Sequence, residues 1–286
     1  MNPILIGTIA ALCWGTLDFL AGQTSRAIGS VRTTAAVTIA GLMLLSAWLA
    51  AAGGFPDLTS NELWLPAVAG AGYALATMCL FAAISLGPVS LAVPIVMAYP
   101  ATMVVAASLM GRVPGSLQLA LVAMIMAGVV IAAWAEAENA SGPIPWRRRK
   151  TTIGLAILSH LTFLFAVFAG QKAAAIFGEI QSVWMSRLAG CLIMAPFLFT
   201  RTKSAPIDKR LWAPLAFMGG FDVGALSLLF AAGRSDHPEL AVVCASASGA
   251  VTVILARVVS RERILPLRWL GIAMTFAGIG LLSAVN

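Results

Sequence analysis

The chain has 286 residues, of which 60% are hydrophobic and 10% are charged, and its net charge is +7. Soluble domains are about 45–50% apolar and about 25% charged, so this composition excludes a soluble fold. The positive residues fall mainly in short loops between apolar segments, and we therefore expect no nucleic-acid partner.

Ten apolar segments of membrane-spanning length follow one another along the chain. An apolar helix needs about 20 residues to cross a hydrocarbon layer of about 30 Å. The segments predict an all-α integral membrane protein with ten transmembrane helices, placed in a bacterial cytoplasmic membrane and surrounded by its lipids. They lie near 3–22, 32–52, 63–85, 90–110, 117–135, 152–172, 180–200, 211–233, 239–259 and 267–285.

The two halves of the sequence are related to each other. Residues 63–66 (Leu-Trp-Leu-Pro) recur as 211–214 (Leu-Trp-Ala-Pro), and 80–83 recur as 229–232, with offsets of 148 and 149. Five spans in each half place the second half upside down in the bilayer, which is the inverted repeat of many alternating-access transporters. The predicted units are a first five-helix repeat, 1–138, a basic linker, 139–151, and a second five-helix repeat, 152–286.

Basic residues are distributed unevenly between the two sets of loops. Thirteen lie in the loops after the odd-numbered spans, whereas three, Arg112, Lys172 and Arg234, lie on the other side. The positive-inside rule then places the odd loops in the cytoplasm and both termini in the periplasm. The basic run at 147–150 is explained by this rule, and contact with anionic lipids is the alternative.

Ionisable residues inside the spans are the first candidates for function, because a charge at the bilayer centre costs about 2.5–3.5 kcal/mol on insertion scales. Asp222 lies near the middle of span eight and is predicted either to line a central polar cavity or to form a buried structural pair. Tyr73 is its repeat partner, 149 residues earlier. Asp18 shares a helical face with Trp14, and it either reaches the interface or takes part in proton coupling.

Two further polar groups interrupt the apolar spans. His160 in span six is predicted to make a helix-packing hydrogen bond, or alternatively to have a cavity or proton-linked role. Arg187 in span seven either reaches toward the interface or pairs with a carboxylate such as Asp222. The proton-coupling candidates are therefore Asp222, Asp18 and His160.

Spans four and nine are the most irregular of the ten. Pro94 and Pro100 flank Tyr99 in span four and predict a kinked helix, because proline breaks the backbone hydrogen-bond ladder. The matching part of span nine is rich in small residues, with Ser248 opposite Tyr99 and Ser246 two residues before it. Such a run is typical of a close-packing face, and its hydroxyls also suit a substrate path. The predicted substrate-binding residues are Asp222, Tyr73, Tyr99, Trp14, Ser246 and Ser248.

The sequence contains no motif of a soluble enzyme. The four cysteines, Cys13, Cys79, Cys191 and Cys244, lie inside spans without any metal-ligand spacing, so we expect no metal site. We expect no catalytic residues and no cofactor. An intramembrane enzyme would need a clustered catalytic set, and the sequence contains none. The pair Asp236-His237 before Pro238 is interpreted as a helix-start turn.

Short motifs of the chain resemble the EamA family of the drug/metabolite transporter superfamily. Residues 11–15 read Ala-Leu-Cys-Trp-Gly, similar to that family's opening, and 261–264 read Arg-Glu-Arg-Ile, similar to its Gly-Glu-Arg-Leu turn. The resemblance implies an exporter of small metabolites with a central cavity lined by helices one, three, four, six, eight and nine. The family's termini usually face the cytoplasm, whereas the loop charges of this chain predict the opposite.

These observations predict a secondary transporter, acting as an exporter of a small polar or amphipathic metabolite, amino-acid-like and carried by proton coupling or exchange. A flippase for a lipid or a lipid-linked sugar is the alternative. We expect a small-molecule substrate and a monomer or homodimer.

Overall fold

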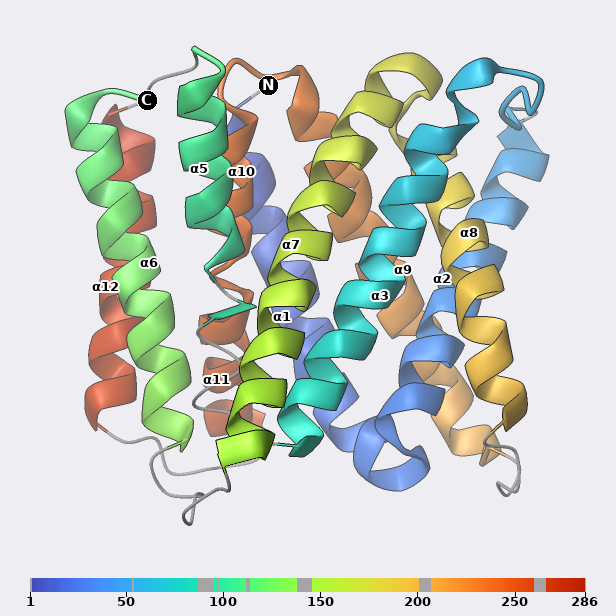
Figure 1. Cartoon of the computed structure of the whole chain (residues 1–286), viewed down its shortest axis with the longest axis horizontal. Helices are drawn as coiled ribbons and strands as arrows, with labels where there is room; N and C mark the ends of the chain where they lie inside the picture. Colours follow the sequence, from blue (N-terminus) through green and yellow to red (C-terminus); the bar gives the residue numbers. More distant parts are fainter. Residues whose placement is uncertain are drawn as a thin grey trace.

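The protein is an all-helical bundle in the part of the chain that the computed structural model describes, which is residues 2–52, 54–86, 95–96, 98–111, 114–137, 146–200, 207–259 and 266–285 (Figure 1). Its α-helices are α1 (Pro3–Ile28), α2 (Ser30–Ala52), α3 (Trp64–Leu86), α5 (Tyr99–Leu109), α6 (Ser116–Ala137), α7 (Trp146–Phe177), α8 (Glu179–Thr200), α9 (Trp212–Ala231), α10 (Pro238–Ala245), α11 (Ser248–Val259) and α12 (Pro266–Val285). Three short 3-10 turns adjoin them: η1 (Asn61–Leu63), η2 (Lys209–Leu211) and η3 (Ala232–Arg234).

Several of these helices are long and apolar enough to cross a membrane. Among the described residues there are seven such segments, and Tyr99–Leu109 and Ser116–Ala132 are shorter apolar helices. The seven are Pro3–Ser25, Val31–Ala52, Asn61–Leu80, Trp146–Phe177, Lys209–Arg234, Pro238–Val259 and Pro266–Val285. Of the ten predicted segments, 90–110 is described only in part, beginning at Ile95. The chain is thus a multi-pass helical protein of membrane type.

The first helix of each half ends in the same way. Asn2 caps the start of α1 by accepting hydrogen bonds from the backbone N–H groups of Ile4 and Leu5. Gly29 follows the last residue of α1 with φ +85°, and Gly178 follows the last residue of α7 with φ +86°. Glycine adopts this left-handed conformation without steric cost, so one residue suffices to join two antiparallel helices. The two glycines are 149 residues apart.

Two helices are longer than their predicted spans. α1 continues to Ile28, so Asp18 lies ten residues before its end and not near the interface end of a shorter helix. α7 begins at Trp146 and therefore contains the basic residues 147–150, which the sequence places in the linker. The 32 residues of α7 span about 48 Å, which is well beyond the hydrocarbon thickness of about 30 Å. Its basic first turn therefore lies outside the apolar layer, where polar side chains are compatible with a helix. Residues 139–145 of the predicted linker lie outside the described residues.

Predicted span nine is broken into two helices. α10 ends at Ala245 and α11 begins at Ser248. The hydroxyl of Ser246 donates to the carbonyl oxygen of Val243 at 2.6 Å, a local bond that competes with a continuous helical ladder. The predicted span 239–259 matches the membrane-length segment Pro238–Val259, which a turn at Ser246 and Ala247 interrupts.

Equivalent helices of the two halves pack alike and run in opposite directions. α1 packs on α9 as α7 packs on α3, and α2 packs on α9 as α8 packs on α3. In Figure 1, α1, α3 and α6 run downward, whereas α7, α9 and α12 run upward. Both termini lie at the upper end of the bundle in this view, and the basic start of α7 lies at the lower end.

Glycines allow the closest helix contacts, and they recur in both halves. The backbone of Gly70 in α3 lies against the Ser186 carbonyl of α8, so a Cβ at Gly70 would clash with it. In the other half, a Cβ at Gly219 of α9 would lie 2.7 Å from the backbone nitrogen of Gly41 in α2. Gly70 and Gly219 are 149 residues apart. Both contacts therefore need a residue without a side chain.

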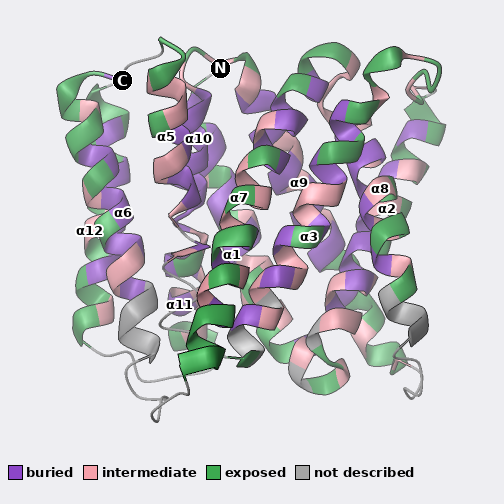
Figure 2. Cartoon of the chain, in the orientation of Figure 1, coloured by how far each residue is buried: buried purple, intermediate pink, exposed green. Residues whose placement is uncertain are grey.

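Burial follows the pattern expected of a helix bundle in lipid. Buried residues gather on the helix faces that meet other helices, and exposed residues cover the outer faces (Figure 2). Large apolar side chains lie on this outer surface, with Leu192 and Phe217 each 68% exposed. Lipid chains are as apolar as these side chains, so the outer face needs no polar cover.

Candidate functional site

A buried ion pair lies between α8 and α9. Arg187 Nη2 of α8 is 2.8 Å from Asp222 Oδ2 of α9, and the two side chains are 3% and 4% exposed. An isolated charge in such a place would be very costly, and two opposite charges in contact offset much of that cost. Asp222 therefore has a basic side chain in direct contact.

Two more helices supply hydrogen bonds to the same carboxylate. Trp14 Nε1 of α1 donates to Asp222 Oδ1 at 3.3 Å, and the hydroxyl of Tyr73 of α3 donates to the same oxygen at 3.2 Å. The Arg187 guanidinium also lies over the Tyr73 ring, 4.6 Å from its centroid. We call Trp14, Tyr73, Arg187 and Asp222 the charge cluster. Four helices from both halves meet in it.

The repeat relation is directly visible in this cluster. Tyr73 and Asp222 hold equivalent positions, 149 residues apart, and they are hydrogen-bonded to each other. A residue can touch its own repeat partner only where both lie beside the axis that relates the halves. The charge cluster therefore occupies the centre of the contact between the two halves.

An aromatic row extends from the cluster toward α5. The Phe163 ring of α7 packs against Tyr73 with centroids 5.4 Å apart and against Tyr99 with centroids 4.8 Å apart. Tyr99 is 5% exposed at the start of α5. The two tyrosines of the chain thus line one continuous wall. Phe163 was not among the predicted site residues.

Asp18 lies on α1 one turn after Trp14. Its side chain is exposed, and its charge interacts with that of Asp222. Two carboxylates so placed repel each other while both are ionised.

His160 makes its hydrogen bonds away from the charge cluster. Its Nδ1 is 2.9 Å from the carbonyl oxygen of Ile95, and its Nε2 is 2.9 Å from the Thr102 hydroxyl. A carbonyl oxygen only accepts, so Nδ1 donates to it, and Nε2 of a neutral imidazole accepts from Thr102. These bonds tie α7 to predicted span four beside its prolines, as the helix-packing interpretation expects.

The two serines of span nine differ in their surroundings. Ser246 is 3% exposed, and its hydroxyl is used in the bond to Val243 at the break between α10 and α11. Ser248 is half-buried at the start of α11, where its carbonyl oxygen accepts from Thr252 at 3.0 Å. The structure does not bring either serine into hydrogen-bond contact with the charge cluster.

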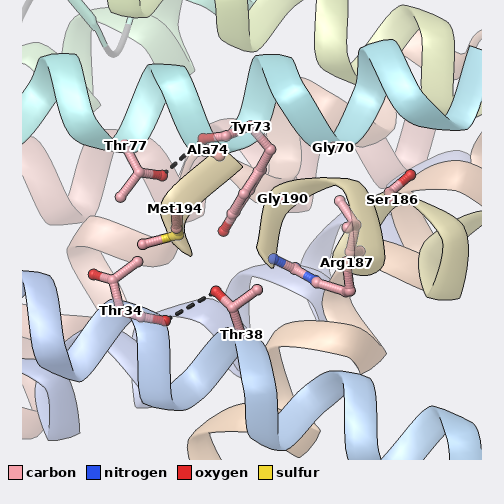
Figure 3. A pocket seen from close by; sticks show the side chains of 11 residues that line it. Thr34, Thr38, Gly70, Tyr73, Ala74, Thr77, Ser186, Arg187, Gly190 and Met194 are labelled. Carbon is pink, nitrogen blue, oxygen red and sulfur yellow. Dashed lines mark hydrogen bonds between the residues drawn. The ribbon is translucent and has the colours of Figure 1, made fainter. Parts of the chain in front are cut away.

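A narrow cavity whose lining includes several hydroxyl-bearing residues adjoins Arg187 on the side of α2. Its volume is about 10 Å³, which is room for about one water molecule. In Figure 3, Tyr73 of α3 and Arg187 of α8 point toward each other, and Thr34 and Thr38 of α2 approach from the opposite side. Nε of Arg187 is buried and has no hydrogen-bond partner among the described residues. The cavity thus places hydroxyl oxygens near an unsatisfied donor.

Sequence reasoning missed the residues that line this cavity. Thr34, Thr38, Thr77 and Ser186 are ordinary helix-packing residues by type, because a threonine or serine hydroxyl can bond to the carbonyl four residues earlier. Three of them do so, Thr38, Thr77 and Ser186. The one available signal was the pair of hydroxyls at 34 and 38, which share a face of an apolar helix.

Comparison with known proteins agrees with this architecture. The model of the EamA-like transporter family matches the chain twice, over residues 1–134 and 150–284. One solved crystal structure superposes with a TM-score of 0.80 at 20% identity, covering 99% of this chain and 97% of the other. That likeness shows a shared fold. No curated protein sequence gives a significant match. Because the family model covers nearly the whole chain, the protein is a multi-pass membrane transporter of the EamA-like transporter family.

Proposed function

We propose that the protein is a secondary exporter of a small polar or amphipathic metabolite, amino-acid-like, which works by alternating access between two inverted five-helix halves. The observation that carries this proposal is the charge cluster. It is buried, it contains both signs of charge, and it lies where the halves meet. Ion pairs of this kind in a membrane protein mark substrate or ion pathways.

The geometry supports competition at Asp222. A substrate ammonium group offers the same charge and hydrogen bonds as Arg187, and it would displace the guanidinium from Asp222 Oδ2. The released guanidinium lies beside the cavity lined by Thr34, Thr38 and Thr77, whose oxygens accept hydrogen bonds. Trp14 and Tyr73 keep Oδ1 occupied throughout. The guanidinium then keeps hydrogen-bond acceptors but has no counter-charge until the substrate leaves.

A proton at Asp222 would act in the same way as a cationic substrate. Protonation removes the attraction to Arg187. Proton coupling or exchange at Asp222, with Asp18 as the second carboxylate, follows from this arrangement. Tyr99 and Phe163 would form the aromatic side of the site, and Ser246 and Ser248 would lie along the substrate path at the break in span nine. His160 remains a third candidate for coupling.

The orientation we propose places both termini in the periplasm of a bacterial cell, with the protein in the cytoplasmic membrane as a monomer or homodimer. It is supported by the position of the basic start of α7 and of Lys209 and Arg210 at the end of the bundle opposite to the termini (Figure 1). A transmembrane protein keeps such residues on the cytoplasmic side.

The test begins with the substrate. Purified full-length protein is screened for thermal stabilisation against a metabolite panel, and hits are tested for counterflow in proteoliposomes. We expect counterflow with wild type and with the exposed control Glu62→Gln, and none with Asp222→Asn. Lipid scrambling without counterflow would indicate the flippase alternative, and product formation without translocation would indicate an enzyme.

A further inference from the structure

A second buried carboxylate lies far from the charge cluster, at the start of α10. Glu239 is 0% exposed, and its Oε1 is 2.8 Å from Nδ1 of His237. The other oxygen, Oε2, is buried and has no hydrogen-bond partner among the described residues. The His237 side chain is 30% exposed, so it connects this carboxylate to water.

The fold alone does not require a carboxylate at this position. Residues 240–242 (Leu-Ala-Val) repeat 91–93 (Leu-Ala-Val), and the residue equivalent to Glu239 in the first half is Ser90. An acidic residue in the first turn of a helix stabilises the helix dipole, but such residues do this while exposed to solvent. Burying the whole Glu239 carboxylate with one oxygen that lacks a hydrogen bond costs more free energy than the helix dipole returns.

Within the part of the chain that the structure describes, few other charges face Glu239. The elements that pack against α10 are α1, α5, α6 and η3. The ends of α1, α5 and α6 at this side of the bundle, residues 3–11, 104–109 and 116–122, contain no ionisable side chain. η3 carries Arg234, which is paired with Glu179 of α8. Asp236 is exposed, and the buried thiol of Cys244 lies against Gly7 of α1.

We propose that His237 and Glu239 together form a proton-binding site at the end of the bundle where both termini lie. With a neutral imidazole and an ionised carboxylate, the pair leaves one negative charge buried. One proton from water neutralises the pair, either as an imidazolium–carboxylate contact or as a carboxylic acid beside a neutral imidazole. The bound proton belongs to the pair, and His237 is its route in and out.

Proton occupancy at this site controls how firmly α10 packs. The loaded pair carries no net charge, so the start of α10 can remain buried against α1 and η3. Loss of the proton leaves an uncompensated carboxylate in the buried first turn of α10, beside Leu240 and Ala241 in the chain. The start of α10 should then loosen. This site goes beyond the proposed function, because it depends on the fold and not on what the protein carries.

The test compares thermal unfolding of ligand-free, full-length protein in detergent across about pH 5 to 8, the range in which a histidine pair titrates. Because the proposed site needs its proton for the start of α10 to stay packed, its stabilisation is present at low pH and is lost as pH rises. We expect the melting temperature of wild type to fall relative to Glu239→Gln by about 2–4 °C across this range. The exposed neighbour variant Asp236→Asn should follow wild type.

Parallel profiles for wild type and Glu239→Gln would overturn the proposal, as would a wild-type profile that rises relative to the variant. If Glu239→Gln does not fold, His237→Gln decides the question. That variant leaves Glu239 as the one titrating group of the pair, so the midpoint of the fall must move, and an unchanged profile overturns the proposal. No substrate enters this experiment, so its failure leaves the transport proposal standing.

Discussion

At the scale of single residues, Asp222 is bound on both carboxylate oxygens. Oδ2 contacts Arg187, and Oδ1 accepts from Trp14 and Tyr73. Such a carboxylate is fixed in position, so its partners share any effect of changing it. The consequence is that Asp222 and Arg187 should be tested as a pair and not one at a time.

Asp222→Asn leaves the buried guanidinium of Arg187 without a counter-charge. We expect this single variant to lose about 3–5 kcal/mol of stability, the usual cost of breaking a buried pair. The double variant Asp222→Asn with Arg187→Gln removes both charges and should recover most of the loss in thermal unfolding, while transport stays abolished. A double variant less stable than either single one would show that the two residues do not act as a pair.

Trp184 of α8 provides a matched control for a substitution at Trp14. Trp14 donates to Asp222, whereas Trp184 Nε1 donates to the Ser46 hydroxyl at 2.8 Å. Phenylalanine at either place removes one interhelical hydrogen bond and keeps an aromatic ring. We expect Trp14→Phe to lower the counterflow rate on the order of tenfold, equivalent to about 1.4 kcal/mol. Trp184→Phe should leave the rate near wild type, and equal losses in the two variants would argue against a direct role for Trp14.

At the scale of elements, the helices were more predictable than their ends. The described part of each predicted span is largely helical, and seven segments are long and apolar enough to cross a membrane. Hydropathy did not predict that α1 continues to Ile28. Gln23 and Thr24 are polar and follow the apolar run, where hydropathy does not show whether the helix continues. The break at Ser246 was also hidden, since alanine and serine fit either a straight or an interrupted helix. The helix contacts most sensitive to substitution are those in which a glycine lies against the backbone of a neighbouring helix.

Two glycines of α9 provide a matched pair for testing these contacts. A Cβ at Gly219 would lie 2.7 Å from the backbone of α2, whereas a Cβ at Gly224 would meet nothing within 4 Å. Gly219→Ala should therefore separate α9 from α2 and lower the melting temperature. Gly224→Ala should be neutral or stabilising by up to about 1 kcal/mol, since alanine favours the helix. Thermal unfolding of the two purified variants checks this, and equal behaviour would contradict the proposed close approach.

At the scale of the whole molecule, the repeat predicted more of the site than any single motif. The offset of 149 residues paired Tyr73 with Asp222 before any contact was known, and the two residues touch. Arg187 was expected as a possible partner from its charge alone. The hydroxyl-lined cavity beside it was not predictable, because its threonines bond locally and resemble packing residues. The turn at 261–264, which carries part of the family resemblance, lies outside the described residues.

The orientation of the whole molecule can be measured directly. A reporter active on one side of the membrane, fused to the C-terminus of the functional full-length protein, should give a periplasmic signal. The physical reason is the excess of basic residues in the loops opposite to the termini. A cytoplasmic signal from a fusion that still transports would contradict this orientation.

The hydrogen bond between Tyr73 and Asp222 also bears on how such a chain arose. In a symmetric dimer of two identical half-length proteins, a position beside the dyad would meet its own copy. Aspartate would then face aspartate and repel it, and tyrosine would face tyrosine with no charge to hold. Only after gene duplication and fusion could the two copies mutate independently, so that one supplies the donor and the other the acceptor. The hydrogen bond between Tyr73 and Asp222 could therefore not have formed in a homodimeric ancestor.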